Sequence, residues 1–286
     1  MPPSGFVPCI VFDPLGHSLT LLDPPSRVAQ FGKGGIHMKM IICRPNWADE
    51  ETLEEHQRTS TPLVDADLKI VALEKGPDWT VCEYDAGLIA REMYEVAEAA
   101  EKDKFDAFIV GSCSDSNARG IKELISDMVI VEPGAAALSV ASFIADKFSV
   151  LTVKEPGIRA MVMKSVQRLG VESKLASIRH VQSATEVVFP TDEEHRQHEA
   201  RQMVEAAKKA VDEDGAEAVI FYSISYRERG VVEIAREMLD NEGYADLPLV
   251  DPACAALNYA RLLVTCGLKQ SKLSYGTPPT SARRKW

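Results

Sequence analysis

A cysteine at the end of an apolar run is the first residue in this chain whose setting suggests chemistry. Cys113 follows the run AFIV at 107–110 and precedes the small polar residues SDSN and a helix-like segment. Backbone N–H groups in such a turn, and the positive end of a following helix, can stabilise a thiolate and so lower the pKa of a cysteine. The sequence therefore predicts a reactive thiol at Cys113.

A second reactive position is predicted to face this thiol, because the surroundings of Cys113 occur twice. The stretch DAFIVGSCSD resembles EAVIFYSISY later in the chain, and the counterpart of Cys113 is taken to be Ser223. Two acid–base groups on opposite faces of a substrate carbon can remove a proton from one face and return it to the other. An alcohol is a far weaker acid and base than a thiol unless a neighbour activates it. The predicted catalytic pair, Cys113 and Ser223, is therefore unequal.

The elements that must position this pair are also duplicated. Two further stretches recur in the same order, KMIICRPN as SVLTVKEP and VEPGAAALSVASF as VDPACAALNYARL. Strand-like apolar runs alternate with helix-length amphipathic segments such as 86–102 and 193–212, which is typical of parallel sheets covered by helices. The predicted fold class is α/β, with two pseudo-symmetric lobes that are each a mainly parallel sheet flanked by helices, and an active-site cleft between them.

The predicted boundaries divide the chain of 286 residues into four parts. An irregular, proline-rich N-terminal extension covers 1–37, and the first lobe covers 38–145, with a last helix able to cross to the other lobe. The second lobe covers 146–279, and a short tail covers 280–286.

Residues that directly follow the predicted strands are candidates for the cleft, because the carboxyl ends of parallel strands open toward ligands. These candidates are Asn46, Ser112, Ser114, Asp115, Glu132, Glu155, Pro156, Ser225, Tyr226 and Asp251. Glu132 and Asp251 have an equally good structural explanation, since each can cap the helix that follows. Tyr226 can equally be an aromatic residue at the rim. Three histidines, His180, His195 and His198, are expected to be structural or solvated.

Composition excludes several other functions. The formal net charge is −11 and the only basic cluster is at the tail, which argues against nucleic acid or an anionic membrane as a partner. No apolar run is long enough to span a bilayer, and no signal-peptide pattern is present, so a cytoplasmic location with reduced cysteines is expected. No CxxC pair occurs among the six cysteines, and no metal site is predicted. Cys43, Cys254 and Cys266 are expected to be buried structural residues.

From about Met38 to Pro279 the chain resembles the aspartate/glutamate/hydantoin racemase superfamily, and within it the hydantoin/allantoin racemase branch. The resemblance rests on the order of PN at 45–46, GP and EYD at 76–85, Cys113 with SDS, VEPGAAA, FSVLTV, VDPACAA and GLKQSKLSYGTPP. It implies a cofactor-independent racemase or isomerase that acts at the carbon next to a carbonyl of a small carboxylate or hydantoin. It also implies an assembly of identical subunits.

The resemblance further implies roles for individual residues. Cys113 looks like the catalytic cysteine of the first lobe, and Asn46, Ser114, Asp115 and Ser116 look like binders of a substrate carboxylate or amide. The second cysteine of the family falls at Ser223, which makes symmetric two-thiol racemisation doubtful. Two alternatives stay open: a single-cysteine decarboxylase, lyase or cis–trans isomerase on the same scaffold, and a non-catalytic protein that binds a small ligand.

Overall fold

The computed structural model describes residues 37–155, 157–181 and 192–279. The predicted N-terminal extension up to residue 36, Pro156 and the tail at 280–286 lie outside these residues. Among the described residues, every helix is too short or too polar to cross a lipid bilayer. The same residues contain no group of three or more His, Cys, Asp or Glu side chains arranged to hold a metal ion.

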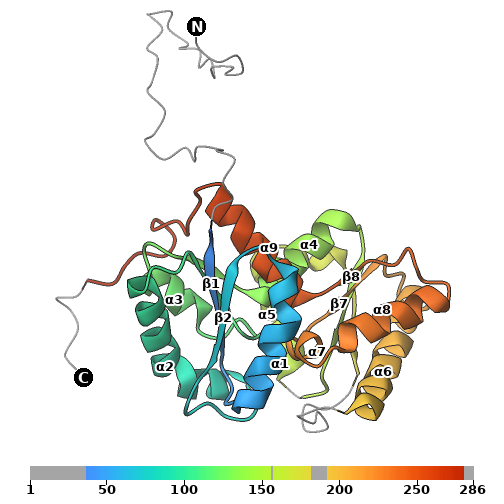
Figure 1. Cartoon of the computed structure of the whole chain (residues 1–286). Helices are drawn as coiled ribbons and strands as arrows, with labels where there is room; N and C mark the ends of the chain where they lie inside the picture. The colour runs from blue at the N-terminus through green and yellow to red at the C-terminus, as the bar shows by residue number, and fades with distance from the viewer. Residues whose placement is uncertain (1–36, 156, 182–191, 280–286) are drawn as a thin grey trace, which may run out of the picture.

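The first sheet has four parallel strands in the order β2-β1-β3-β4 (Figure 1). Their bounds are β1 Lys39–Arg44, β2 Asp67–Ala72, β3 Ala107–Val110 and β4 Val129–Val131. The second sheet repeats this arrangement as β6-β5-β7-β8, with β5 Phe148–Thr152, β6 Leu175–His180, β7 Ala218–Phe221 and β8 Leu249–Val250. The repeated strand order confirms the predicted fold class, two α/β lobes with parallel sheets.

Helices cover both faces of each sheet. Their bounds are α1 Glu50–Ser60, α2 Glu83–Lys102, α3 Ala118–Leu124, α4 Pro133–Ile144, α5 Ile158–Leu169, α6 Glu193–Asp212, α7 Ser225–Glu228, α8 Val231–Asn241 and α9 Pro252–Thr265. Short 3₁₀ turns occupy η1 Thr61–Leu63 and η2 Glu172–Lys174. The predicted helical segments 86–102 and 193–212 lie within α2 and α6.

Side chains alternate across the first sheet, as the two-residue period of a strand requires. Met40 and Ile42 of β1 join one buried cluster, whereas Ile41 and Cys43 join the cluster on the opposite face. Neither face of β3 or β4 reaches solvent, which explains why these strands are continuous apolar runs in the sequence, whereas the edge strand β2 exposes Asp67 and Lys69.

The helices α4 and α9 are exchanged between the lobes. Leu138 and Ala141 of α4 belong to the core of the second sheet, together with Phe148. Leu257 and Ala260 of α9 belong to the core of the first sheet. The two helices also pack against each other, and Figure 1 shows them side by side at the junction of the lobes. Each half of the chain therefore completes the core of the other lobe.

Candidate active site

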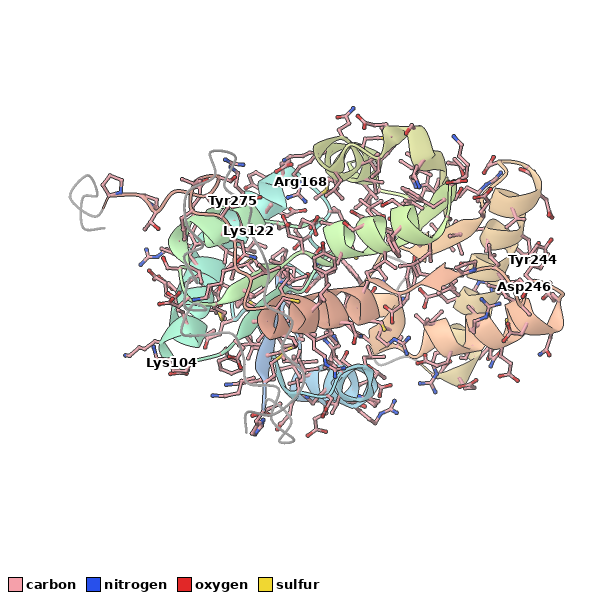
Figure 2. All side chains as sticks on the ribbon, turned by 90° about the horizontal axis from the view of Figure 1, so that it is seen from above. Lys104, Lys122, Arg168, Tyr244, Asp246 and Tyr275 are labelled. Atoms are coloured by element: carbon pink, nitrogen blue, oxygen red, sulfur yellow. The ribbon has the colours of Figure 1, made fainter. Side chains whose placement is uncertain are left out.

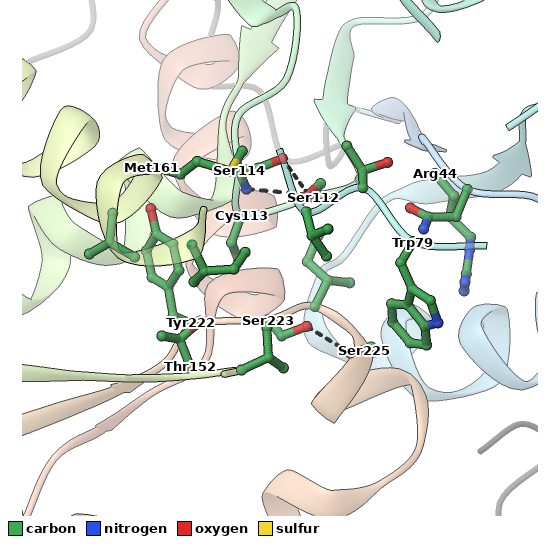
Figure 3. A pocket seen from close by; sticks show the side chains of 18 of the residues that line it. Arg44, Trp79, Ser112, Cys113, Ser114, Thr152, Met161, Tyr222, Ser223 and Ser225 are labelled. Atoms are coloured by element: carbon green, nitrogen blue, oxygen red, sulfur yellow. Dashed lines mark hydrogen bonds between the residues drawn. The ribbon is translucent and has the colours of Figure 1, made fainter. Parts of the chain in front are cut away.

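A cavity of about 90 Å³ lies between the lobes at the carboxyl ends of both sheets. Figure 3 shows Ser112, Cys113 and Ser114 of the first lobe on one side, and Ser223 and Ser225 of the second lobe on the other. Cys113 and Ser223 thus line the same cavity, as the sequence predicts. An apolar part of the wall comes from Val81, Val153, Ile158, Met161, Val162 and Ile224.

Backbone hydrogen bonds show how the chain leaves β3 in the first lobe. The Gly111 N–H donates to the Cys43 carbonyl at 2.7 Å, and the Ser112 N–H donates to the Val110 carbonyl at 2.8 Å. A Cβ atom on Gly111 would lie 2.5 Å from the Cys43 carbonyl oxygen, so only glycine allows this close approach.

The chain leaves β7 in the same way in the second lobe. The Tyr222 N–H donates to the Leu151 carbonyl at 2.8 Å, and the Ser223 N–H donates to the Phe221 carbonyl at 2.7 Å. Phe221 pairs with Leu151 in the sheet, just as Val110 pairs with Cys43.

These bonds place Ser223 at the position equivalent to Ser112. Cys113, one residue further along, is equivalent to Ile224. The expectation that Ser223 is the counterpart of Cys113 is therefore wrong by one residue, although both side chains reach the cavity. The two stretches DAFIVGSCSD and EAVIFYSISY already agree with the structure, because read letter by letter they align Ser223 with Ser112 and Ile224 with Cys113.

Each lobe presents a hydrogen-bonded pair of hydroxyl groups at these equivalent positions. Ser112 Oγ lies 2.8 Å from Ser114 Oγ, and Ser223 Oγ lies 2.7 Å from Ser225 Oγ. In the first lobe the chain of hydroxyls continues, since Ser114 Oγ lies 2.6 Å from Ser116 Oγ. The cavity thus offers donors and acceptors without net charge on both sides.

Cys113 is 5% exposed, and its surroundings hold the thiol in its neutral form. Burial, followed by the negative charges of Asp115, Asp251 and Glu228, raises the pKa of Cys113 well above its usual value. The backbone N–H of Ile224 acts in the opposite direction but is outweighed. The predicted low-pKa thiolate is contradicted, because α3 begins only at Ala118 and a helix dipole weakens within about one turn.

An ion-paired group from three elements lies at the other end of the cavity. Arg44 ends β1, and its Nη1 lies 2.7 Å from Glu228 Oε2 of α7. His56 of α1, which is fully buried, places Nδ1 3.1 Å from Glu228 Oε1. Arg44 and Glu228 both line the cavity. Burial lowers the pKa of His56 to about 4, so its ring is neutral at neutral pH.

Three predicted ligand-binding residues, Asp115, Ser116 and Glu132, lie outside the lining of this cavity. They line a second cavity of about 200 Å³, which shares Ser114 and Met161 with the first. Asp115 and Glu132 are held there by Arg168, which crosses from α5 of the other lobe.

At the second cavity, the acidic side chains are paired with basic ones. Glu132 also pairs with Lys122, and the Lys122 ammonium lies over the ring of Tyr275, 5.3 Å from its centroid. Figure 2 shows Lys122, Arg168 and Tyr275 gathered at this place. Burial and the nearby Glu132 carboxylate raise the pKa of Asp115. Glu132 makes no capping hydrogen bond to α4, so that alternative explanation is also wrong, whereas Asp251 does cap α9.

Tyr226 also lies outside the cavity lining and is fully buried. Its ring packs edge-on against Phe221 with centroids 6.1 Å apart, and the Arg229 guanidinium lies 5.6 Å from its centroid. The expected roles of substrate donor and rim aromatic are both contradicted by this burial. Asn46 and Ser225 do line the cavity, and the Asn46 amide donates to the Asp78 carbonyl at 2.7 Å.

The remaining cysteine and histidine expectations are met in part. Cys43 is buried, but Cys254 is only partly buried and Cys266 is exposed. His180 places Nδ1 2.9 Å from the Val153 carbonyl, in agreement with a structural role. Both His195 and His198 are exposed on α6, as expected.

Sequence reasoning missed the apolar wall of the cavity and several of its polar or aromatic residues, among them Arg44, Trp79, Tyr222 and Glu228. Arg44 could have been predicted from the sequence, because a charged residue at the end of a buried strand needs an ion-pair or hydrogen-bond partner. Tyr222 is the last residue of an apolar run and gives no sign of leaving the sheet. Glu228 is one of several charges in YRERG, and Trp79 lies in a loop, so neither stands out.

The family model described as Asp/Glu/hydantoin racemase matches residues 50–260 of this chain. The chain belongs to this family. It therefore belongs to a family of enzymes, racemases of the isomerase class. The hydantoin racemase of Paenarthrobacter aurescens is 29% identical over 248 residues, which cover 85% of this chain and 98% of that enzyme. A hydantoin racemase of Pseudomonas sp. strain NS671 is 28% identical over 237 residues, which cover 82% of this chain and 90% of that enzyme.

Solved structures show the same fold. Allantoin racemase from Klebsiella pneumoniae superposes with a TM-score of 0.72 at 18% identity, covering 87% of this chain and 96% of that one. Allantoin racemase from Pseudomonas fluorescens has the same TM-score at 23% identity, covering 87% and 99%. The matched regions include both lobes, so the two-lobed architecture is shared.

Proposed function

We propose that this protein is a cofactor-independent racemase or isomerase that exchanges the proton on a carbon next to a carbonyl group. Cys113 serves one face of that carbon, and the hydroxyl of Ser223 faces the other. The observation that carries the proposal is the cavity between the lobes, lined by Cys113 from one lobe and Ser223 from the other, in a chain of the racemase family.

The electrostatics of the cavity favour a neutral cyclic amide, such as a hydantoin, over a free carboxylate. Asp251 and Glu228 both act against negative charge at Cys113. Arg44, the one cation among the described residues that line the cavity, is already paired with Glu228. A substrate carboxylate would meet this negative field without a dedicated partner. Carbonyl and N–H groups of a cyclic amide instead match the hydroxyls and the Asn46 amide.

The raised pKa of Cys113 defines its part in the reaction. A neutral thiol is a proton donor, so Cys113 is suited to protonate a carbanion or enolate. The same property supports a second candidate function, the decarboxylase, lyase or cis–trans isomerase chemistry in which one cysteine protonates an enolate. Inversion of a single enantiomer distinguishes racemisation from these reactions.

The test uses one enantiomer of 5-isobutylhydantoin in deuterated buffer that contains EDTA. We expect deuterium uptake at C5, followed by NMR, and loss of optical rotation. Cys113→Ala is expected to lower the inversion rate by about 10²–10⁴-fold, the range for loss of a general acid or base. Cys266→Ala is the matched control, because this thiol is exposed and lies outside the cavity lining. Equal rates in the parent and Cys113→Ala would refute the proposed role of the thiol.

A further inference from the structure

The second face of the cavity lacks an obvious base. Ser223 and Ser225 are hydroxyls, and an alcohol is negligibly ionised near neutral pH unless a neighbour activates it. Glu228 lies one helical turn beyond Ser225, at the end of α7, and lines the same cavity. Among the described lining residues it is the one carboxylate.

The surroundings of Glu228 keep it ionised although it is 3% exposed. Burial by itself would raise the pKa of Glu228, but the charges of Arg44, His56 and Arg229 outweigh burial and hold the pKa below its usual value. Because His56 is neutral at neutral pH, Arg44 and Arg229 supply the positive charge. A carboxylate of this kind is a weak base, yet it is far more basic than a neutral hydroxyl.

Glu228 and Cys113 come from opposite lobes. Glu228 ends α7 in the second lobe, whereas Cys113 follows β3 in the first. Their protonation states also suit a proton transfer, because the ionised Glu228 can accept a proton and the neutral Cys113 can donate one. Glu228 reduces the ionisation of Cys113, so their charges are coupled across the cavity.

We propose that Glu228 is a catalytic base of this enzyme and serves the face of the substrate opposite Cys113. This inference rests on the proposed function, and it assigns to Glu228 the proton transfer that the Ser223 hydroxyl cannot perform alone.

The step balances without another reactant. The Glu228 carboxylate takes the proton from the carbon next to the carbonyl, and the C–H electron pair moves into the carbonyl group to form an enolate. The S–H bond of Cys113 then breaks, and its proton is delivered to the opposite face of that carbon while the carbonyl re-forms. Glu228 is left protonated and Cys113 is left as a thiolate. This state accepts the other enantiomer, or it resets when solvent carries the proton from Glu228 to Cys113.

The two faces can be tested separately by exchange without inversion. Each pure enantiomer of 5-isobutylhydantoin is incubated with enzyme in deuterated buffer, and early deuterium uptake at C5 is measured by NMR. Glu228→Gln is expected to lower exchange by about 100-fold or more for the enantiomer whose C5–H faces the second lobe. Exchange of the other enantiomer needs the thiolate of Cys113, so in Glu228→Gln it is expected to persist in buffer alkaline enough to ionise that thiol. Cys113→Ala is expected to give the reverse pattern.

Glu199→Gln is the matched control, because Glu199 is a carboxylate of the same lobe that is 5% exposed, pairs with Arg229 and lies outside the cavity lining. It is expected to exchange both enantiomers. Glu228→Asp, which keeps a carboxylate, is expected to recover part of the exchange on the second-lobe face.

Three results would overturn the inference. Exchange of both enantiomers by Glu228→Gln at parental rates would exclude Glu228 as a base. If Glu228→Gln loses exchange of both enantiomers even in the alkaline buffer, while Glu199→Gln keeps both, Glu228 is a structural residue. Absence of exchange in the parent protein would instead refute the proposed function on which the inference depends.

Discussion

The thiol of Cys113 shows how far the surroundings of one residue can change its chemistry. Its place between a strand and a polar turn resembles that of an activated cysteine. In the folded protein, however, burial and neighbouring carboxylates favour the neutral form, and the start of α3 is five residues away. Two of these carboxylates, Asp251 and Glu228, lie far from Cys113 in the sequence, so the pattern around Cys113 could not reveal them.

The raised pKa of Cys113 predicts slow alkylation. With iodoacetamide at pH 7.5, we expect Cys266 to be labelled first, because it is exposed, and Cys113 to react much more slowly. Its rate should rise with pH until well above pH 9, since the thiolate is the nucleophile. Mass spectrometry of the labelled peptides measures each site, with the buried Cys43 as an unreactive reference. Labelling of Cys113 before Cys266 would instead indicate the low-pKa thiolate that the sequence suggests.

Local sequence predicted most of the elements but only part of the site. Apolar runs located the strands most clearly for β3, β5 and β7, whose two faces are both buried, and amphipathic periods located α2 and α6. The strand ends then led to Asn46, Ser112, Cys113 and Ser223. Glu228 could not be found in this way, because its role depends on a contact with β1 and α1, far away in the chain. Asp115 and Glu132 were predicted to line this cavity, but both form ion pairs with Arg168 of the other lobe instead.

Among the elements, the start of α4 fits closely against the turn that carries Cys113. The Gly134 N–H donates to Asp115 Oδ1 at 3.1 Å, in the turn that follows Cys113. A Cβ atom on Gly134 would lie 2.4 Å from the Cys113 carbonyl oxygen and 2.4 Å from the Tyr222 hydroxyl. One of these neighbours is backbone, so it cannot move without shifting Cys113 itself.

Gly134→Ala is therefore expected to destabilise the protein by about 1–3 kcal/mol, the usual cost of an overpacked core. It should also slow turnover, because the displaced backbone carries Cys113. Gly87→Ala is the matched control, since Gly87 lies in α2 with no atom in the way of a Cβ. That change should stabilise the protein by about 0.5–1 kcal/mol, because glycine is unfavourable inside a helix. Urea unfolding measures both free energies, and an unaffected Gly134→Ala would show that the turn can adapt.

In the whole molecule, the two lobes are held together by exchanged helices and by ion pairs, in addition to the segments that link them. Helices α4 and α9 each complete the core of the opposite lobe. Ion pairs also cross between the lobes, such as Arg44 with Glu228 and Arg168 with Glu132. The Arg44–Glu228 pair lines the cavity itself, so the position of Cys113 relative to the second lobe depends on contacts between the lobes.

Because α9 comes from the second half of the chain but packs on the first sheet, a cavity-forming substitution in α9 is expected to weaken the first lobe. Leu257 of α9 is fully buried in the core of the first sheet, and Leu257→Ala is expected to cost about 2–5 kcal/mol of unfolding free energy. Leu262→Ala changes the same helix at a residue that is 54% exposed, and should stay within about 0.5 kcal/mol of the parent.

Amide hydrogen exchange locates the effect of Leu257→Ala. We expect β1, β3 and β4 to lose protection, although they precede α9 by more than a hundred residues, because α9 covers their sheet. If the second sheet loses protection by the same amount, the lobes unfold as one cooperative unit, as expected from the paired packing of α4 against α9. Loss of protection confined to the second sheet would contradict the exchanged arrangement.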